Sequence, residues 1–179
     1  MLSVTRTNKG DSDLQAMMDV HYSRPKGFVG RQLFYRIEFA GVLYGCIAFG
    51  SATRFLPGRD INAPLNCGMN NIFYHIEKVN GKYPARNFTT MALLAAERIA
   101  CVDYKDRYGD DVLWIESLVE YPRIGKLYLM AGYRHVGDTK GFTCKRIAGK
   151  GTDNWTGKRV WDTVNLRPKK VFLKEVLKT

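Results

Sequence analysis

The 179-residue sequence lacks the features of membrane and secreted proteins. No apolar run approaches the roughly 18 residues that a membrane-spanning helix needs, and the polar segment Met1–Gly10 contains no hydrophobic stretch of a secretory signal. The four cysteines are widely spaced and form no CxxC pair, which argues against a disulfide scaffold and leaves a four-cysteine zinc site as a minor alternative. No internal repeat or low-complexity tract is present. We therefore expect a folded cytosolic protein with reduced thiols.

Negative charge is also scarce, because 17 Asp and Glu stand against 28 Lys and Arg, a net charge of +11. Residues 140–179 hold 11 basic and 3 acidic side chains and so carry +8 of this excess. The same segment contains Trp155 and Trp161. Basic groups neutralise phosphates and aromatic rings stack on bases, so the composition favours a nucleic-acid partner. A basic surface without a partner is the alternative.

Hydrophobic residues make up 45% of the chain, enough for a core, and their spacing predicts alternating strands and helices. We expect a loose polar terminus over 1–13 and a long helix, capped by Asn87 and running to about Tyr104, that buries a stripe of Met91, Leu94, Ala95, Ile99 and Val102. The other expected elements are a short helix 14–19, a hairpin of strands 32–39 and 42–51 turning at Ala40–Gly41, a long loop 54–69, strands 71–79 and 112–119, a short helix 125–131, a strand 134–145 and a last strand-like run, KVFLKEV.

The strand–helix–strand unit over 71–119 requires a crossover connection, which predicts a mostly parallel centre of the sheet. This order of elements matches the acyltransferase fold called GNAT. The sequence therefore predicts an α/β protein with a GNAT-like mixed central sheet flanked by helices. We expect an N-terminal segment 1–19, a catalytic core 20–145 and a basic C-terminal extension 146–179 that packs on the core or on DNA.

In the GNAT fold the pyrophosphate of coenzyme A lies on the N-terminus of the long helix, where free N–H groups and the helix dipole attract anions. In this sequence the corresponding candidates for cofactor binding are Tyr83, Arg86, Asn87 and Thr89. The glycine-rich sequence that usually forms this loop is absent. An ordinary capped helix is therefore the alternative.

Six stretches together resemble the Mom-type adenine-modification proteins of bacteriophages and, more distantly, the first component of the Druantia defence system. They are HYSRPKGFVGRQL, FGSATR, NNIFYHIE, IESLVEYPRIGKLY, YRHVGDTKGFTCKR and GKGTDNWTGKRVWDTVNLRPKKVF, within residues 20–175. The resemblance implies an enzyme that uses acetyl-CoA to convert adenine N6 of double-stranded DNA to N6-methylcarbamoyladenine. Such a protein works in the cytoplasm of the bacterial host and protects phage DNA from restriction. The family also implies a nitrogen donor and allows a bound iron.

Carboxylates at the end of the strand 112–119 stand where open α/β folds place active sites. Glu120 occupies a position that is acidic in the family, an aspartate, and is our candidate for general base or metal ligand. Glu116 lies on the same face of this strand as Glu120 and is a second candidate. The alternative for Glu116 is a charge at the surface or at a helix N-cap. His21 and Tyr22, in the loop before the hairpin, are candidates for proton transfer. We expect them to converge with Glu120, and these three form the possible metal set.

Tyr128, on the short helix, matches by position a GNAT tyrosine that protonates the leaving thiolate of coenzyme A. Tyr133 competes for that role, and packing of Tyr128 on the sheet is the alternative. Ser117 is a candidate for a hydrogen bond to a reacting oxygen.

Adenine N6 is hidden in a duplex, so the enzyme must flip the base or act on single strands. The candidate DNA-binding residues are Arg31, Lys145, Arg146, Lys150, Trp155, Lys158, Arg159 and Arg167. Two other functions stay open. One is a non-catalytic DNA-binding module of a defence or anti-defence system, and the other is an ordinary GNAT acetyltransferase acting on RNA or protein.

Overall fold

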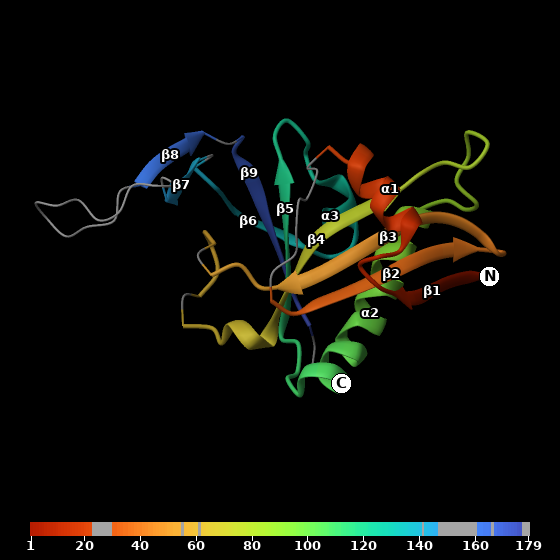
Figure 1. Ribbon diagram of the computed structural model, residues 1–179, viewed down its shortest axis with the longest axis horizontal. Coiled ribbons are helices and arrows are strands. Elements are labelled where there is room, and N and C mark those ends of the chain that lie inside the picture. The colour runs from red at the N-terminus through yellow and green to blue at the C-terminus, as the bar shows by residue number, and fades with distance from the viewer. Residues whose placement is uncertain are drawn as a thin grey trace, which may run out of the picture.

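The computed structural model describes residues 1–22, 30–54, 56–60, 62–140, 142–146, 161–165 and 167–176, with the backbone alone for 142–146 and 161–165. Its elements are β1 Leu2–Thr7, α1 Ser12–Val20, β2 Gln32–Phe39, β3 Val42–Ser51, η1 Leu65–Cys67, β4 Gly68–Ile76, α2 Phe88–Tyr108, β5 Trp114–Glu120, α3 Lys126–Met130, β6 Arg134–Asp138, β7 Phe142–Arg146, β8 Trp161–Asn165 and β9 Lys169–Glu175 (Figure 1).

Seven strands form the central sheet in the order β1-β2-β3-β4-β5-β9-β6. Each neighbouring pair is antiparallel except β4 and β5, which α2 connects as a parallel pair. The expected crossover is therefore confirmed, but the mostly parallel centre is not, because β4 and β5 are the single parallel pair among the described strands. The turn between β2 and β3 has positive φ at both Ala40 and Gly41, as a tight hairpin requires.

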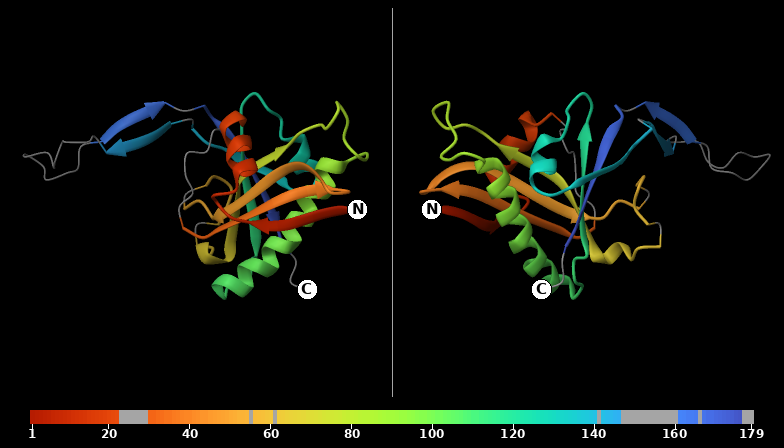
Figure 2. Two further views of the ribbon diagram at one scale, coloured as in Figure 1. Left: turned by 45° about the vertical axis from the view of Figure 1, so that its right-hand side comes forward. Right: turned by 180° about the vertical axis from the view of Figure 1, so that it is seen from behind.

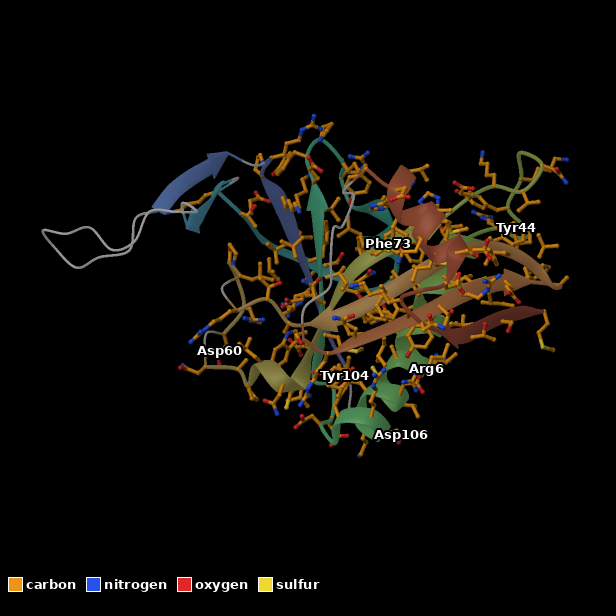
Figure 3. All side chains as sticks on the ribbon, viewed as in Figure 1. Arg6, Tyr44, Asp60, Phe73, Tyr104 and Asp106 are labelled. Atoms are coloured by element: carbon orange, nitrogen blue, oxygen red, sulfur yellow. The ribbon has the colours of Figure 1, made fainter. Side chains whose placement is uncertain are left out.

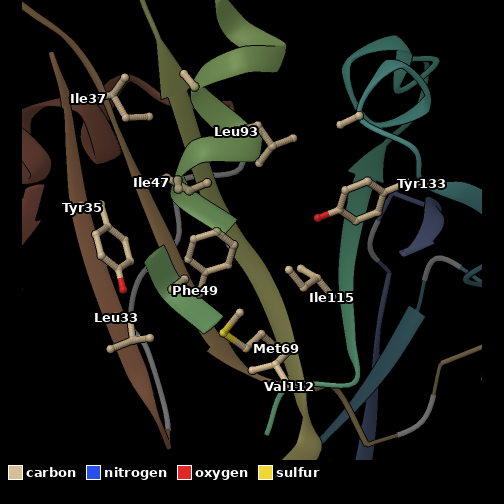
Figure 4. Close-up of a cluster of buried hydrophobic side chains, with 14 of the residues drawn as sticks. Leu33, Tyr35, Ile37, Ile47, Phe49, Met69, Leu93, Val112, Ile115 and Tyr133 are labelled. Carbon is tan, nitrogen blue, oxygen red and sulfur yellow. The ribbon is translucent and has the colours of Figure 1, made fainter. Parts of the chain in front are cut away.

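Helices cover both faces of the sheet (Figures 1 and 2). The larger core cluster joins α2 and α3 to one face, where alternate residues of β2 such as Leu33, Tyr35 and Ile37 point (Figure 4). A smaller cluster on the other face joins Leu14 and Met18 of α1 to β2, β3 and β4. The period-two alternation of β2 thus supplies both cores.

The buried stripe that we expected on α2 is wrong at its two ends, whereas Leu94 and Ile99 of that stripe are partly buried and pack against the core. Met91 is 48% and Val102 is 59% exposed. The buried apolar side chains are instead Phe88, Ala92, Leu93, Ala96, Ala100 and Tyr104. Three of these are alanines one helical turn apart, and their small side chains let α2 lie close to the sheet.

The ends of the chain contribute more to the sheet than expected. Residues 2–7, expected to be loose, form β1 and pair with β2. The run KVFLKEV is a strand, as expected, but it lies as β9 between β5 and β6. The expected strand 134–145 is two strands, because β7 leaves the sheet and pairs with β8. The central sheet therefore includes strands from outside residues 20–145.

Within the described residues, no helix is long and apolar enough to cross a membrane. Cys46, Cys67 and Cys101 are free thiols.

Candidate active site

The candidate site begins where β4 and β5 diverge. Their parallel pairing runs from Gly68 opposite Trp114 to Asn71 opposite Ser117 and then stops, although both strands continue. On its other side β4 shifts register against β3, because Phe49 pairs with Asn71 and Ala48 with Phe73. Ile72 is therefore the extra residue of a bulge, which bends a strand and re-aims its side chains.

A cavity of about 230 Å³ occupies this divergence. Its walls come from the end of α1, from β4 and β5, and from the turn that leads into α3; Phe73, on the β4 wall, is labelled in Figure 3. The lining residues are His21, Tyr22, Asn71, Ile72, Phe73, Tyr74, Ser117, Leu118, Val119, Arg123, Gly125, Lys126, Leu127 and Tyr128. Four of the five predicted catalytic residues, all but Glu120, are thus gathered in one place.

Tyr128 presents its hydroxyl to β4 and β5. Asn71 Nδ2 donates a hydrogen bond to Tyr128 Oη at 3.2 Å, and Ser117 makes a second hydrogen bond with this oxygen. The ring packs against Tyr133 and Phe172, with centroids 5.2 and 5.7 Å away. Burial raises the pKa of Tyr128 above its ordinary value, although Ser117 opposes the shift. The phenol is therefore protonated at neutral pH and can donate a proton.

Tyr133, the competitor for that role, is engaged elsewhere. Its hydroxyl donates to Glu97 Oε1 at 2.7 Å, and Glu97 Oε2 also binds Lys174 Nζ at 2.5 Å. The sequence offered both tyrosines as candidates. Of the two, Tyr128 lines the cavity and Tyr133 does not.

His21 closes the cavity at the end of α1. It is 9% exposed, and its ring lies 5.0 Å from that of Phe73 and 5.9 Å from that of His75. Burial, together with the charges of His75 and Arg123, lowers the pKa of His21 to about 4. A hydrogen bond with the Tyr74 backbone opposes this shift but does not outweigh it. His21 is therefore a neutral imidazole at pH 7.

Tyr22 stands at the cavity mouth, with 40% of its surface exposed. The guanidinium of Arg123 lies over the Tyr22 ring, 3.7 Å from its centroid. A backbone hydrogen bond joins the Tyr22 phenol to Glu120, so the expected approach of His21 and Tyr22 to the end of β5 is present. The aromatic ring and the cation together form one exposed rim.

Glu120 lies outside the cavity lining, where Arg167 Nε is 3.3 Å from its Oε1. Glu116 is neither a surface charge nor a helix cap, the alternative that the sequence left open for it. It is fully buried, pairs with Arg59 Nη1 at 2.8 Å and accepts a hydrogen bond from the Thr53 N–H. Burial raises the pKa of Glu116 against these two partners. Glu116 thus anchors the β3–β4 loop to the sheet.

The possible metal set of His21, Tyr22 and Glu120 does not fit an iron. In the part of the chain that the structure describes, no three His, Cys, Asp or Glu side chains gather where they could hold a metal ion. The Arg123 guanidinium covers the Tyr22 ring, and Arg167 already pairs with Glu120. Because two arginine cations already lie beside these residues, binding of a metal cation there would be electrostatically unfavourable. We therefore derive no step through a metal.

The candidate cofactor residues Tyr83, Arg86, Asn87 and Thr89 lie at the start of α2. Asn87 is the N-cap residue, as expected, with φ of 58° and no capping hydrogen bond from its side chain. Among the described residues, the backbone N–H groups of Thr89 and Thr90 have no acceptor. Tyr74, on the cavity wall, donates from its hydroxyl to the Thr89 carbonyl at 2.5 Å. This bond links the cavity to a helix end suited to an anion.

The candidate DNA-binding residues are only partly described. Arg31 is held by Asp110 at 2.6 Å and by the Tyr104 hydroxyl at 3.1 Å, so its charge is already paired. Arg167 is 73% exposed apart from its contact with Glu120. Lys145 and Arg146 lie on β7, where the backbone alone is described, and Lys150, Trp155, Lys158 and Arg159 lie outside the described residues.

Sequence reasoning missed Asn71, Tyr74, Arg123 and Lys126 as lining residues. A signal for Asn71 was present, because asparagine is depleted in strands and Asn70–Asn71 stands inside an apolar strand pattern. Arg123 and Lys126 carry no such signal, since a charged turn after a strand is ordinary.

No family model and no curated protein matches this chain. Solved structures match it over almost its whole length. A Bacillus subtilis acetyltransferase in complex with CoA has a TM-score of 0.62 and 13% identity, covering 99% of this chain and 100% of that one. A GNAT family acetyltransferase from Elizabethkingia anophelis with acetyl-CoA bound has a TM-score of 0.57 and 11% identity, covering 98% of each chain.

The chain has the GNAT fold. A third matching structure, the ribosomal-protein-S18-alanine N-acetyltransferase from Escherichia coli, has a TM-score of 0.57 and 8% identity, covering 100% of this chain and 96% of that one. The mixed sheet and flanking helices predicted from the sequence are therefore confirmed. Within this fold, the divergence of β4 and β5 and the first turn of α2 stand side by side through Tyr74.

Proposed function

We propose that this GNAT-fold protein is an acetyl-CoA-dependent transferase. The observation that carries the proposal is the cavity between β4 and β5, which holds a protonated tyrosine and connects through Tyr74 to the open N-terminus of α2. Two matching structures are described with CoA or acetyl-CoA bound, which supports the same ligand here. Acetyl-CoA supplies a thioester, whose carbonyl carbon accepts a nucleophile and whose sulfur leaves.

The chain's own residues divide between binding and proton transfer. The free N–H groups of Thr89 and Thr90 bind the pyrophosphate, with Arg86 adding a charge-assisted contact and Tyr83 and Asn87 flanking it. The bulge at Ile72 frees backbone groups of β4 to hold the thioester carbonyl. Ser117 and Asn71 hold the hydroxyl of Tyr128 in place.

In a simple acetyl transfer, the acceptor nitrogen forms a C–N bond to the carbonyl carbon while the C–S bond breaks. Tyr128 gives its proton to the leaving thiolate, and the nitrogen loses one proton. We assign the acceptance of that proton to His21, which lines the cavity, rather than to Glu120, which lies outside it beside Arg167. One proton thus passes from nitrogen to sulfur overall.

The finer proposal is that the acceptor is adenine N6 in phage DNA and that the product is N6-methylcarbamoyladenine, made in the cytoplasm of the bacterial host. It is supported by the resemblance to Mom-type proteins and by the excess of basic residues at the end of the chain. Making a CH2–C(=O)NH2 group requires two things in addition to the thioester. These are a nitrogen donor and an acceptor for two electrons. The mass of the product therefore reports which co-reactants take part.

Mass spectrometry of nucleosides from plasmid DNA, after expression of the protein in a bacterium, tests this proposal. We expect deoxyadenosine to gain C2H3NO and expect Tyr128→Phe to lose most of the product. Titration of the purified protein with CoA is the companion measurement. Unmodified nucleosides and no CoA binding would contradict the proposal and favour a DNA-binding module.

An ordinary N-acetyltransferase is the second candidate, because the E. coli protein that shares this fold is an S18-alanine N-acetyltransferase. Its product gains C2H2O rather than C2H3NO, on RNA or protein. The same mass measurement, applied to digests of all three polymers, separates the two candidates.

A further inference from the structure

The charged side chains that line the cavity are all of one sign, although Glu120 and Glu97 lie outside its lining. Its described lining contains two cations, Arg123 and Lys126, and the neutral His21, but no Asp or Glu. Glu120, at the end of β5, is paired with Arg167. An ammonium group entering this cavity would meet like charge and would find no carboxylate among the described lining residues to hold it.

Asn71, which lines the same cavity, carries an unused hydrogen-bond acceptor. The residue is 5% exposed, and its Nδ2 is committed to Tyr128 Oη at 3.2 Å. Its Oδ1 is buried and has no partner within the described residues. A buried carbonyl oxygen without a hydrogen bond is unfavourable, so this position favours a ligand that brings an N–H group.

We propose that Asn71 determines acceptor specificity: Oδ1 accepts a hydrogen bond from the acceptor's amino group, and the cationic lining admits amines that are uncharged at neutral pH. Aromatic amines and the exocyclic amines of nucleobases belong to this class. Alkylammonium groups, such as those of lysine and polyamines, do not. The inference rests on the proposed acyl transfer in this cavity.

The proton chemistry agrees with this selection. In a simple acetyl transfer, an aromatic amine attacks without losing a proton first, and once bonded to the acyl carbon its nitrogen is acidic enough for a weakly basic imidazole to deprotonate. An alkylammonium must lose a proton before it can attack at all. A neutral asparagine can orient an N–H group but cannot accept that proton.

The first test compares acceptors with the full-length protein and acetyl-CoA, measuring released CoA by chromatography at neutral pH. The uncharged acceptors are a single-stranded oligonucleotide of dA and dT, in which adenine carries the sole exocyclic amine, and an aniline. The charged ones are spermidine and a lysine peptide. We expect kcat/KM for one of the uncharged acceptors to exceed that for both charged ones by about 100-fold or more.

The second test is Asn71→Asp, which keeps the shape of the side chain but supplies a negative charge. We expect a loss of about 10-fold or more with the uncharged acceptor, a measurable rate with spermidine, and a spermidine rate that rises toward alkaline pH. Asn70→Asp is the matched control, because Asn70 is equally buried on the same strand but does not line the cavity. This control should change no acceptor preference.

The outcomes distinguish a failure of the proposed specificity from a failure of the proposed acyl transfer. Thioester cleavage that is faster with spermidine or the peptide in the unsubstituted protein overturns the inference and leaves acyl transfer standing. An unchanged preference in a folded Asn71→Asp variant overturns the role of Asn71. Absence of both CoA binding and thioester cleavage removes the proposed function and this inference with it.

Discussion

Tyr128 is placed for catalysis by residues from three elements, since Asn71 and Ser117 hold its hydroxyl and Tyr133 and Phe172 pack its ring. Tyr128→Phe removes one oxygen and keeps this packing. We expect kcat to fall by about 10²- to 10⁴-fold, the usual contribution of a general acid, while the affinity for CoA stays within a factor of about three. Single-turnover kinetics and a CoA titration measure the two quantities.

Tyr44→Phe is the matched control, because this tyrosine of β3 loses the same atom outside the cavity. It should leave kcat unchanged. A Tyr128→Phe enzyme with the full rate would show that the thiolate takes its proton from another group.

For single residues, the sequence predicted which side chains lie close together, but it predicted the role of each side chain less well. His21, Tyr22, Ser117 and Tyr128 share one cavity, as expected from strand ends and the first loop. The role of a carboxylate depends on partners far along the chain, which local patterns do not contain. Glu116 is bound by Arg59, 57 residues away, and so became an anchor of the β3–β4 loop.

The position of α1 depends on its N-cap and on two buried side chains. Asp11 Oδ1 accepts hydrogen bonds from the N–H groups of Asp13 and Leu14, both at 3.0 Å, and Leu14 and Met18 pack on the sheet. His21 directly follows this helix as its C-cap residue. The cap of α1 therefore supports one wall of the cavity.

Asp11→Ala should destabilise the protein by about 1–2 kcal/mol at neutral pH, as the loss of a helix cap does. Burial opposes ionisation of Asp11, but hydrogen bonds from Thr7, the Leu14 N–H and Arg36 outweigh it and lower the pKa from 3.8 to about 2. Because the folded pKa is the lower one, this stabilisation is complete above the unfolded pKa and is lost as pH falls through the folded one. Urea unfolding across the acid range measures it.

The difference in stability between the two proteins should therefore shrink as the pH falls from about 4 to about 2. Asp13→Ala is the comparison, because Asp13 also contacts Arg36, at 2.8 Å, whereas among the described residues it is the Asp11 side chain, and not that of Asp13, that caps the helix start. Asp13→Ala should lower the free energy of unfolding by less than Asp11→Ala does. A difference that stays constant down to pH 2 would show that the charge of Asp11 does not stabilise the cap.

The elements themselves were largely predictable, and their errors have physical causes. Local periodicity identified the hairpin, the crossover unit and the short helix of Tyr128. It placed the ends of the buried stripe of α2 at Met91 and Val102, whereas the helix buries a neighbouring stripe whose three alanines let it lie close to the sheet. It recognised KVFLKEV as a strand but could not place it between β5 and β6, because strand neighbours are set by pairing across long stretches of chain.

At the scale of the whole molecule, the two proposed ligands are assigned to different parts of the chain. The candidate CoA site lies where β4 and β5 diverge near the centre of the sheet, while β1 and β6 are the two edges. The β6 edge continues into the basic segment that begins near residue 140, where most of the excess positive charge is found in the sequence.

Binding to double-stranded DNA should therefore weaken steeply with salt, and charge reversal in the basic segment should reduce that dependence. For Lys158→Glu with Arg159→Glu we expect the slope of log Kd against log salt to fall by about 2, the value for two lost phosphate contacts. Arg6→Glu with Lys9→Glu makes the same change in net charge near the β1 edge and should alter the slope less. Equal slopes for the two variants would show that net charge, and not the basic segment, determines DNA binding.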